Sequence, residues 1–391
     1  MDNFEFYSPT RFIFGKGRET EIGKFASRFG ANRILMVYGG ASAERSGLLN
    51  KVRAALKEAE LPLFELGGVK PNPRSGLVYK GIDICRENGV DFVLAVGGGS
   101  VIDTAKAIAG GVPYDGDFWD FHIGKATMQS ALPVGVILTI AAAGSEGSDG
   151  CVITNENGMH KRPGGSELLR PRFAILDPEL TETLPPYQTA CGVTDIMAHV
   201  LERYFTNTPD VETSDRLCEA LLLTLVNEAP KVMRNPKDYQ ARANIMWTGS
   251  LAHSDIVGVG RAQDWSSHEI EHELSALYDC AHGAGLAVIF PAWMHFVLEH
   301  DVDRFYKLAV RVWGCETSED RLSVAKEGVK RFTAFLRSLG MPTSFGELGA
   351  KEEDIPTLVE NLFYERSGKI GQFVPLGRGE CESIYRIAAK A

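Results

Sequence analysis

The amino-acid sequence predicts an α/β domain followed by an all-helical domain. Up to about residue 184, short runs rich in β-branched residues alternate with segments of helical periodicity. This alternation is typical of parallel strands joined by right-handed helical crossovers. After Leu184-Pro185-Pro186, long helical patterns dominate. We therefore expect two domains, residues 1–184 and residues 185–391.

The individual elements follow from this patterning. In the first domain we expect three strand–helix pairs, in which strands 33–38, 63–66 and 91–96 precede helices 48–60, 75–88 and 101–109. The apolar stretch 131–144 is predicted to be a buried strand, because a membrane span needs about 20 residues. In the second domain we expect helices at residues 189–205, 212–228, 239–253, 265–278 and 285–300.

Composition and charge restrict the class of protein. The chain has 391 residues and a formal net charge of -10, so no basic surface is available for a nucleic-acid partner. The seven cysteines are scattered and include no C-x-x-C pair, which favours a reducing compartment. The N-terminus shows no signal-peptide pattern. We expect a cytoplasmic protein with no nucleic-acid or membrane partner.

A glycine-rich turn, Gly97-Gly98-Gly99-Ser100, lies between a predicted strand and a predicted helix. Backbone N–H groups there can approach a diphosphate, and a helix N-terminus favours anions. The turn is not the common G-x-G-x-x-G dinucleotide fingerprint, so a plain tight turn is the alternative interpretation. Ser100 could cap the helix or contact phosphate. Asp103 and Lys106 could serve the ligand or only the helix.

The residues after the first predicted strand bear on which nucleotide would bind. Tyr38-Gly39-Gly40-Ala41-Ser42 contains no acidic residue that could bind a ribose 2′-hydroxyl, as an Asp or Glu does in NAD sites. Small side chains and a hydroxyl leave room for a 2′-phosphate. This segment favours NADP(H) over NAD(H).

The second half contains five candidate metal ligands. Asp195 and His199 are four residues apart, as are His268 and His272, and His282 follows shortly afterwards. On a helix, a spacing of four places both side chains on one face. Carboxylate and imidazole ligands suit Zn²⁺ or Fe²⁺. A single histidine is more often an ordinary core or surface residue, so the hypothesis depends on the clustering.

His268-Glu269-x-x-His272 also matches the H-E-x-x-H pattern of zinc metalloproteases. In that pattern both histidines bind zinc and the glutamate is the general base. Tyr278 stands where the longer form of the motif requires a third histidine. A protease would also leave the glycine-rich turn and the Asp195/His199 pair unexplained, so we regard this alternative as the weaker one.

Taken together, the motifs resemble the iron-containing (group III) alcohol dehydrogenases, especially their NADP-dependent butanol dehydrogenase branch. The resemblance covers nearly the whole chain and implies a Rossmann-like N-terminal domain and an all-helical C-terminal domain. This is also the architecture of the dehydroquinate synthase type, with the active site in the cleft between the domains. The matching segments are residues 4–17, 69–73, 96–106, 192–199, 271–276 and 281–287.

The resemblance also assigns roles to individual residues. It implies one divalent metal, Fe²⁺ or Zn²⁺, with four ligands: Asp195, His199, His268 and His282. His272 would lie beside the metal, where it could relay a proton or orient a ligand or the substrate. The implied cofactor contacts are Gly39, Gly40 and Ser42 near the 2′-phosphate, Asn72, Gly97, Gly98, Gly99 and Ser100 at the diphosphate, Thr139 and Lys161. We add Asp103, from the glycine-turn helix.

The chain departs from the family pattern at a few cofactor-side positions. Ala143 replaces a threonine that is common in the family, and Asp149 replaces a neutral residue. Ala41 stands where the NADP branch tends to have a third glycine. These departures bear on cofactor affinity and preference rather than on the reaction.

The expected activity is hydride transfer between NADP(H) and a small aliphatic alcohol or aldehyde such as butanol and butanal. A metal- and NAD-using lyase of the dehydroquinate synthase type is the first alternative, although no Arg/Lys cluster near the candidate ligands suits a phosphorylated acid. A non-catalytic binding protein is another alternative, which the complete ligand set disfavours. A homodimer is possible.

Overall fold

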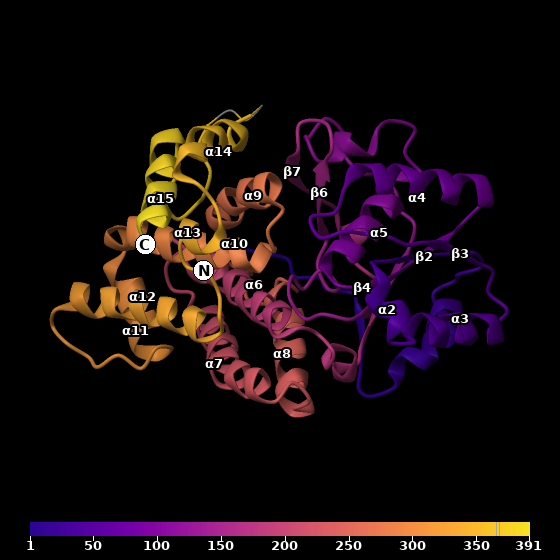
Figure 1. The fold of residues 1–391 in the computed structure, drawn as a ribbon, viewed down its shortest axis with the longest axis horizontal. Coiled ribbons are helices and arrows are strands. Elements are labelled where there is room, and N and C mark those ends of the chain that lie inside the picture. The colour runs from indigo at the N-terminus through magenta and orange to yellow at the C-terminus, as the bar shows by residue number, and fades with distance from the viewer. Residues whose placement is uncertain (365, 367) are drawn as a thin grey trace. The chain divides into compact units, whose positions relative to one another are not determined.

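The computed structural model describes residues 1–391 apart from Glu365 and Ser367, and apart from the side chains of Ala41 and Ser42. The chain forms two compact units, one from Tyr7 to Leu184 and one that joins Pro185–Ala391 with Met1–Phe6 (Figure 1). The first six residues therefore depart from the predicted division, which placed them in the first domain. The Met1 ammonium group donates to the Pro209 carbonyl at 2.9 Å, a contact that sequence patterning does not reveal.

The unit Tyr7–Leu184 is built on a six-stranded parallel sheet with the order β1-β8-β5-β4-β2-β3. Every residue of β4, β5 and β8 is buried, as expected where helices cover both faces of a parallel sheet. The strands are β1 Arg11–Phe14, β2 Ile34–Tyr38, β3 Leu63–Leu66, β4 Phe92–Gly97, β5 Val134–Leu138 and β8 Phe173–Leu176. The helices are α1 Ile22–Arg28, α2 Ala41–Arg45, α3 Leu48–Glu58, α4 Ser75–Asn88 and α5 Gly99–Gly111. The predicted α/β class is confirmed.

Several strands lay outside the sequence prediction. β1 and β8 are only four residues long, and β6 (Gly150–Asn155) pairs with β7 (His160–Gly165) as a separate antiparallel hairpin. The predicted strand 131–144 is also too long, because β5 covers only Val134–Leu138. Short strands carry too few residues for a clear period, and the apolar run 131–144 extends past both ends of β5, so it does not mark where the strand begins or ends.

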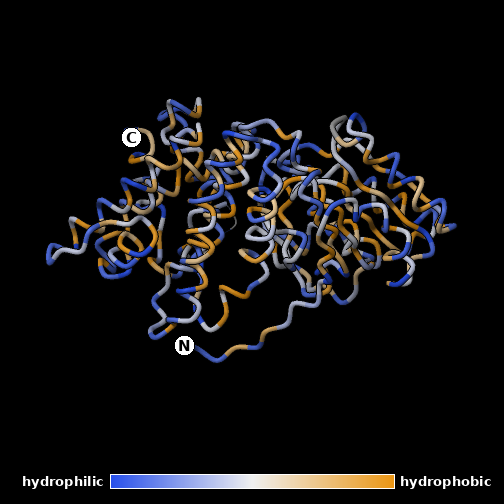
Figure 2. Tube along the Cα trace, turned by 90° about the horizontal axis from the view of Figure 1, so that it is seen from below, coloured by the Kyte–Doolittle hydropathy of each residue, from blue (hydrophilic) through white to orange (hydrophobic). Residues whose placement is uncertain are grey.

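The two faces of this sheet are covered by different helices. Ile34, Met36 and Leu94 belong to one buried cluster with side chains of α1 and α3. Because alternate residues of a strand point to opposite faces, Leu35 and Val93 face the other side, where α5 packs against β4 and β2. Figure 2 shows hydrophobic colours gathered in the interior of this unit.

The glycine-rich turn joins β4 to α5 directly. β4 ends at Gly97, Gly98 is the N-cap residue, and α5 begins at Gly99, two residues earlier than predicted. Ser100 does not cap the helix, because it lies in the first turn and its carbonyl accepts a bond from Thr104 Oγ1 at 2.8 Å. None of the three glycines has a positive φ. A Cβ on Gly98 would lie 2.0 Å from Ile140 Cγ2, so the turn needs glycine for space.

The second unit is helical, as predicted. Its helices are α6 Pro186–Tyr204, α7 Glu212–Arg234, α8 Tyr239–Ala252, α9 Ser266–Tyr278, α10 His282–Val297, α11 Val302–Arg311, α12 Arg321–Ser338, α13 Phe345–Leu348, α14 Ile355–Leu362 and α15 Arg378–Lys390. α10 is buried from Gly283 to Met294 and packs against α6, α9, α12 and α15. A helix that is apolar on all sides belongs in a core. α10 therefore forms the centre of this unit.

α10 begins three residues before its predicted start, so His282 is its first residue. A Cβ on Gly283 would lie 2.1 Å from the backbone carbonyl oxygen of Cys191 in α6. Glycine at this position therefore lets the first turn of α10 approach α6 closely, which places His282 next to the residues of α6.

Two further expectations concern the chain as a whole. All seven cysteines are free, and six of them are buried, with Cys280 half-buried. Within the described part of the chain, none of the helices is both long enough and apolar enough to span a bilayer.

Candidate functional site

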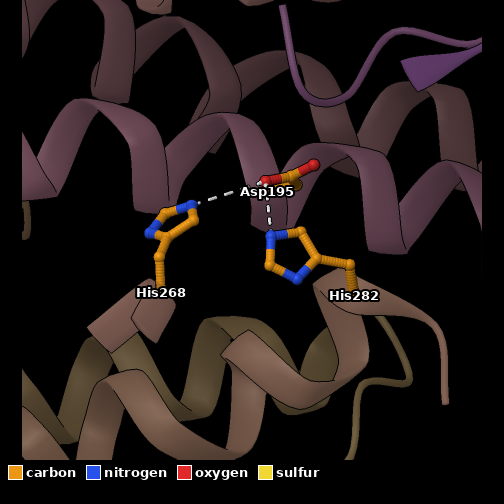
Figure 3. A group of neighbouring side chains, drawn as sticks. All are labelled: Asp195, His268 and His282. Carbon is orange, nitrogen blue, oxygen red and sulfur yellow. Dashed lines mark ion pairs between the residues drawn. The ribbon is translucent and has the colours of Figure 1, made fainter. Parts of the chain in front are cut away.

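Asp195, His268 and His282 converge from α6, α9 and α10 (Figure 3). The Nε2 atoms of His268 and His282 lie 3.9 and 3.8 Å from the same atom, Oδ1 of Asp195. Asp195 and His268 are buried, whereas the side chain of His282 is 24% exposed, so solvent reaches the group on the His282 side. The structure thus brings together three of the four metal ligands that the resemblance implies.

The donor atoms of this group suit a divalent cation. Among the described residues, Asp195 Oδ1 and His268 Nε2 are buried without a hydrogen-bond partner. Buried polar atoms in proteins are nearly always satisfied, so two such atoms that face one another indicate a missing partner. One carboxylate and two imidazoles can bind Zn²⁺ or Fe²⁺. The residues present therefore fit the metal that the sequence predicts.

The electrostatics of this group favour a negative carboxylate among cationic or polar rings. Burial acts to raise the pKa of Asp195, but the charges of His199 and His282 outweigh it and hold this pKa well below its ordinary value. Burial acts to lower the pKa of His268, yet the carboxylates of Asp195 and Glu202 raise it to about 9. A cation that binds to His268 Nε2 must therefore displace a proton.

His199, the fourth predicted ligand, lies beside the group in a different orientation. Its Nδ1 bonds the backbone carbonyl of Asp195 at 2.8 Å and lies 3.0 Å from Oδ1 of the same residue. Its ring contacts that of His268 edge to face, with centroids 4.6 Å apart. The structure places His199 in contact with the site, and its role as a ligand stays a prediction.

His272 belongs to a second group, with Glu271 and His282, whose potential ligand atoms lie within 4.8 Å of one another. Its ring centroid lies 5.6 Å from that of His282. The two histidines of the H-E-x-x-H match therefore fall in different groups, and Glu269 forms an ion pair with Arg366. This arrangement differs from a protease motif, in which both histidines bind one zinc.

Sequence reasoning missed two carboxylates that contact the predicted ligands. Glu202 and Glu271 are fully buried, and each bonds the Nδ1 atom of one imidazole, His268 for Glu202 and His282 for Glu271. The only available signal was weak: Glu202 lies seven residues after Asp195 and Glu271 three residues after His268, spacings that share a helical face.

The predicted cofactor residues lie in the unit Tyr7–Leu184. Lys161 in β7 donates from Nζ to Asn72 Oδ1 at 3.0 Å, so the structure brings together two predicted contacts that are 89 residues apart. Gly97 is buried, whereas Gly98, Gly99 and Ser100 are half-buried at the N-terminus of α5.

Thr139 follows β5, and the first glycine pair, Gly39-Gly40, follows β2, the two strands on either side of β4 in the sheet. The Thr139 amide bonds the Gly97 carbonyl at 3.0 Å, which places Thr139 beside the glycine-rich turn. Gly39 and Gly40 follow β2 directly and are half-buried and exposed. The side chain of Ser42 lies outside the described part of the structure.

Asp103 and Lys106 face the protein. The Asp103 carboxylate accepts bonds from Ser145 Oγ at 2.7 Å and from the Val152 amide at 3.0 Å. Lys106 Nζ donates to the carbonyls of Ser148 and Gly150 at 2.8 and 2.9 Å. Of the two roles considered for these residues, the contacts favour the one that serves the fold, because they tie α5 to residues 145–152.

The departures at Ala143 and Asp149 lie near this segment. A Cβ built on Gly99 would lie 3.2 Å from the Ala143 Cβ, so Ala143 is next to the turn. Asp149 is paired with Arg170 at 3.2 Å and therefore has a partner within the fold.

Comparison with known proteins identifies the class. The model of the iron-containing alcohol dehydrogenases matches residues 9–178, and the model of the C-terminal region of this family matches residues 189–389. The chain therefore belongs to the iron-containing alcohol dehydrogenase family, and the predicted family and NAD(P)-dependent oxidoreductase class are confirmed. Membership implies a divalent metal and a nicotinamide dinucleotide.

Individual members of the family are similar to this chain over its whole length. The chain is 43% identical over 388 residues to a probable NADH-dependent butanol dehydrogenase 2 of Bacillus subtilis, with 99% of each chain covered. It is 36% identical to the NADPH-dependent aldehyde reductase YqhD of Escherichia coli, covering 99% of this chain and all of that protein. Its fold matches the crystal structure of an NADH-dependent butanol dehydrogenase A from Thermotoga maritima with a TM-score of 0.97, at 38% identity and with 100% and 99% of the two chains covered.

Proposed function

We propose that this protein is a metal-dependent alcohol dehydrogenase and aldehyde reductase that transfers hydride between NADP(H) and a small aliphatic alcohol or aldehyde, such as butanol and butanal. The observation that carries the proposal is the convergence of Asp195, His268 and His282 with unsatisfied donor atoms facing one another, in a chain of the iron-containing alcohol dehydrogenase family. Relatives named butanol dehydrogenase and aldehyde reductase support the substrate class.

In this proposal Asp195, His199, His268 and His282 hold one Fe²⁺ or Zn²⁺. A divalent ion supplies Lewis-acid stabilisation of negative charge on the substrate oxygen, and the nicotinamide supplies the hydride chemistry. Asp195 contributes the negative charge that attracts the ion. The imidazoles contribute neutral nitrogen ligands, so the site keeps a net positive charge for an oxygen ligand. His199 would need to direct a ring nitrogen to the same ion.

His272 is our candidate for moving the proton that accompanies hydride transfer. An imidazole titrates near neutral pH and can both accept and donate a proton. Its ring lies beside that of His282, the most exposed member of the group. A proton from the substrate hydroxyl would pass to a His272 ring nitrogen and then to solvent. Alternatively, His272 would only orient a ligand or the substrate.

The substrate class is inferred from one large aromatic side chain beside the ligands. The ring of Trp265 lies 5.1 Å from His268 and 5.7 Å from His199. A large apolar ring at this distance favours an aliphatic chain over a charged substrate.

For the cofactor we propose that Gly97, Gly98, Gly99 and Ser100 bind the diphosphate through backbone N–H groups at the start of α5. Gly39, Gly40 and Ser42 would face the adenosine ribose, and Asn72, Thr139 and Lys161 would make further contacts. The first acidic residue after β2 is Glu44, and its carboxylate pairs with Arg53 at 2.9 Å. Because Glu44 already has a partner, we favour NADP(H), although relatives are named for both coenzymes.

The test measures the absorbance of the reduced nicotinamide with butanal, using NADPH and NADH separately. The protein is first stripped of metal and then reconstituted with Fe²⁺ or Zn²⁺ under anaerobic conditions, with His268→Ala as the control. We expect metal-dependent oxidation that is faster with NADPH and absent in the control. If neither coenzyme is consumed with a panel of aldehydes while metal binds, the dehydrogenase proposal is wrong and the lyase becomes the first hypothesis.

A further inference from the structure

We propose that Glu202 and Glu271 are positioning residues that hold His268 and His282 with their Nε2 atoms directed at Asp195. This inference rests on the proposed metal site, and it concerns which side chains determine the affinity of that site. It assigns a function to two buried carboxylates that would otherwise have no part in the reaction.

Glu202 holds His268 and the start of its helix together. Its Oε1 lies 2.8 Å from His268 Nδ1 and accepts the His268 backbone amide at 3.0 Å. Its Oε2 accepts the Trp265 amide at 2.9 Å. Because an ionised carboxylate only accepts hydrogen bonds, Nδ1 of His268 must be the donor. Once a cation has displaced the second ring proton, the metal-binding lone pair is on Nε2, which lies 3.9 Å from Asp195 Oδ1.

Glu271 has the same relation to His282. Its Oε2 accepts a bond from Nδ1 of His282, and its Oε1 accepts one from the hydroxyl of Ser275 one turn later. The glutamate side chain has room only because residue 285 is glycine, where a Cβ would lie 2.3 Å from Glu271 Oε1. The His282 ring therefore directs Nε2 towards Asp195 Oδ1, at 3.8 Å.

The two pairs form a chain of contacts across three helices. Glu202 of α6 holds the histidine of α9, and Glu271 of α9 holds the histidine of α10. Carboxylates that bond the far nitrogen of a ligating imidazole fix its tautomer and orientation and raise its basicity. His199 differs, because its Nδ1 bonds a backbone carbonyl of its own helix. The structure thus gives a carboxylate to each of the two imidazoles whose Nε2 atoms face Asp195.

The experiment measures the affinity of the metal-stripped full-length protein for Co²⁺ and Zn²⁺, by chelator competition and by the visible spectrum of bound Co²⁺. The variants are Glu202→Gln and Glu271→Gln, which keep side-chain size and remove the charge. We expect each to weaken binding about 10- to 100-fold and to change the Co²⁺ spectrum. Glu219→Gln is the matched control, because Glu219 is also a buried glutamate of this unit but pairs with Arg216 and Arg311.

A second variant reaches Glu271 without removing its charge. In Gly285→Ala the new methyl group would displace the end of a flexible side chain, the Glu271 carboxylate, rather than any backbone atom. We expect the variant to fold and to bind metal at least about 10-fold more weakly. Gly379→Ala in α15 is its control, because a Cβ there meets nothing within 4 Å. This variant decides the question for Glu271 if Glu271→Gln does not fold.

The outcomes separate the two proposals. If the wild-type protein binds neither ion, the proposed function itself fails. If the wild-type protein binds metal and Glu271→Gln, Glu202→Gln and Gly285→Ala bind it equally well with an unchanged spectrum, the positioning role is wrong and the metal site stands.

Discussion

The two units of this protein bury charged groups in different ways. In the unit Tyr7–Leu184, the ammonium group of Lys106 donates to two backbone carbonyls, and the Asp103 carboxylate accepts bonds from Ser145 and Val152. In the helical unit, the Oδ1 atom of Asp195 has no hydrogen-bond partner within the described chain, and ring nitrogens of His199, His268 and His282 lie 3.0, 3.9 and 3.8 Å from it.

This difference distinguishes charged groups that stabilise the fold from charged groups that are available to bind a ligand. A buried charge is costly unless it is paired, so satisfied groups such as Lys106 are explained by the fold alone. Unsatisfied groups that converge are candidates for binding and catalysis. We therefore propose that the chemistry lies with Asp195 and its neighbours, and that the buried Lys106 and the half-buried Asp103 beside the glycine-rich turn serve the fold.

Removal of the metal should have the largest effect of the changes that we propose. It should greatly lower activity, which depends on the helical unit, without affecting coenzyme binding, which depends on the other unit. Stripping by a chelator should lower kcat/KM for butanal by at least about 10³-fold, because the metal contributes several kcal/mol of charge stabilisation. Binding of the reduced coenzyme, followed by its fluorescence, should survive stripping because its proposed contacts lie in the other unit. Full activity in the stripped protein would contradict the proposed role of Asp195.

Acid should act on the unit Tyr7–Leu184 through His122. Burial lowers the pKa of His122 to about 4, and its Nδ1 bonds the carbonyl of Arg162 at 3.1 Å. An unfolded chain takes up a proton near pH 6.5 but the folded chain does not, so stability is fully present above that pH and is lost as the pH falls through about 4. The loss amounts to about 3 kcal/mol.

Urea unfolding at pH 7.5 and 4.5 tests this linkage. His122→Gln, which cannot take up the proton in either state, should show a smaller loss of stability between the two pH values. An equal loss in both proteins would mean that His122 does not carry it.

Gly283→Ala should perturb the packing that places His282. The added Cβ would meet the backbone carbonyl of Cys191, which cannot move as cheaply as a side chain. We expect the free energy of unfolding to fall by about 1–3 kcal/mol. Gly379→Ala serves as the control and should change stability by less than about 1 kcal/mol. Thermal denaturation of both variants measures the difference, and similar Tm values would show that α10 and α6 do not need this close approach.

Gly98→Ala should produce the smallest effect, and this effect should be limited to the affinity for the coenzyme. The new Cβ would push on Ile140 and move the turn, so we expect coenzyme affinity to fall about 10-fold, equivalent to about 1.4 kcal/mol. Metal affinity should remain that of the wild-type protein. A variant that loses metal and keeps coenzyme would reverse the assignment of the two sites.

Patterns in the sequence predicted those parts of the fold that depend on residues close together along the chain. The change from β4 to α5 is visible in the sequence because an apolar run, three glycines and a helical period follow one another. The family resemblance implied only that Lys161 and Asn72 are each cofactor contacts, and their pairing could not be predicted because 89 residues separate them. The attachment of Met1–Phe6 to the helical unit was mispredicted because it depends on contacts with distant residues such as Pro209.

For the site, too, the sequence predicted local relations between residues but not the contacts between distant ones. The spacing of Asp195 and His199 indicates a shared helical face, but the direction of each ring depends on tertiary packing. Glu202 escaped notice because its partner, His268, belongs to another helix and because a lone glutamate in a helix is usually exposed.

The central claim is that Asp195, together with His268 and His282, holds a divalent ion. The most direct test is the metal content of anaerobically purified wild-type protein and of Asp195→Asn, determined by plasma mass spectrometry, with Glu219→Gln as the control. The account predicts about one Fe or Zn ion per chain in the wild-type and control proteins and almost none in Asp195→Asn. Equal metal content in all three proteins, or none in the wild-type protein after reconstitution, would contradict it.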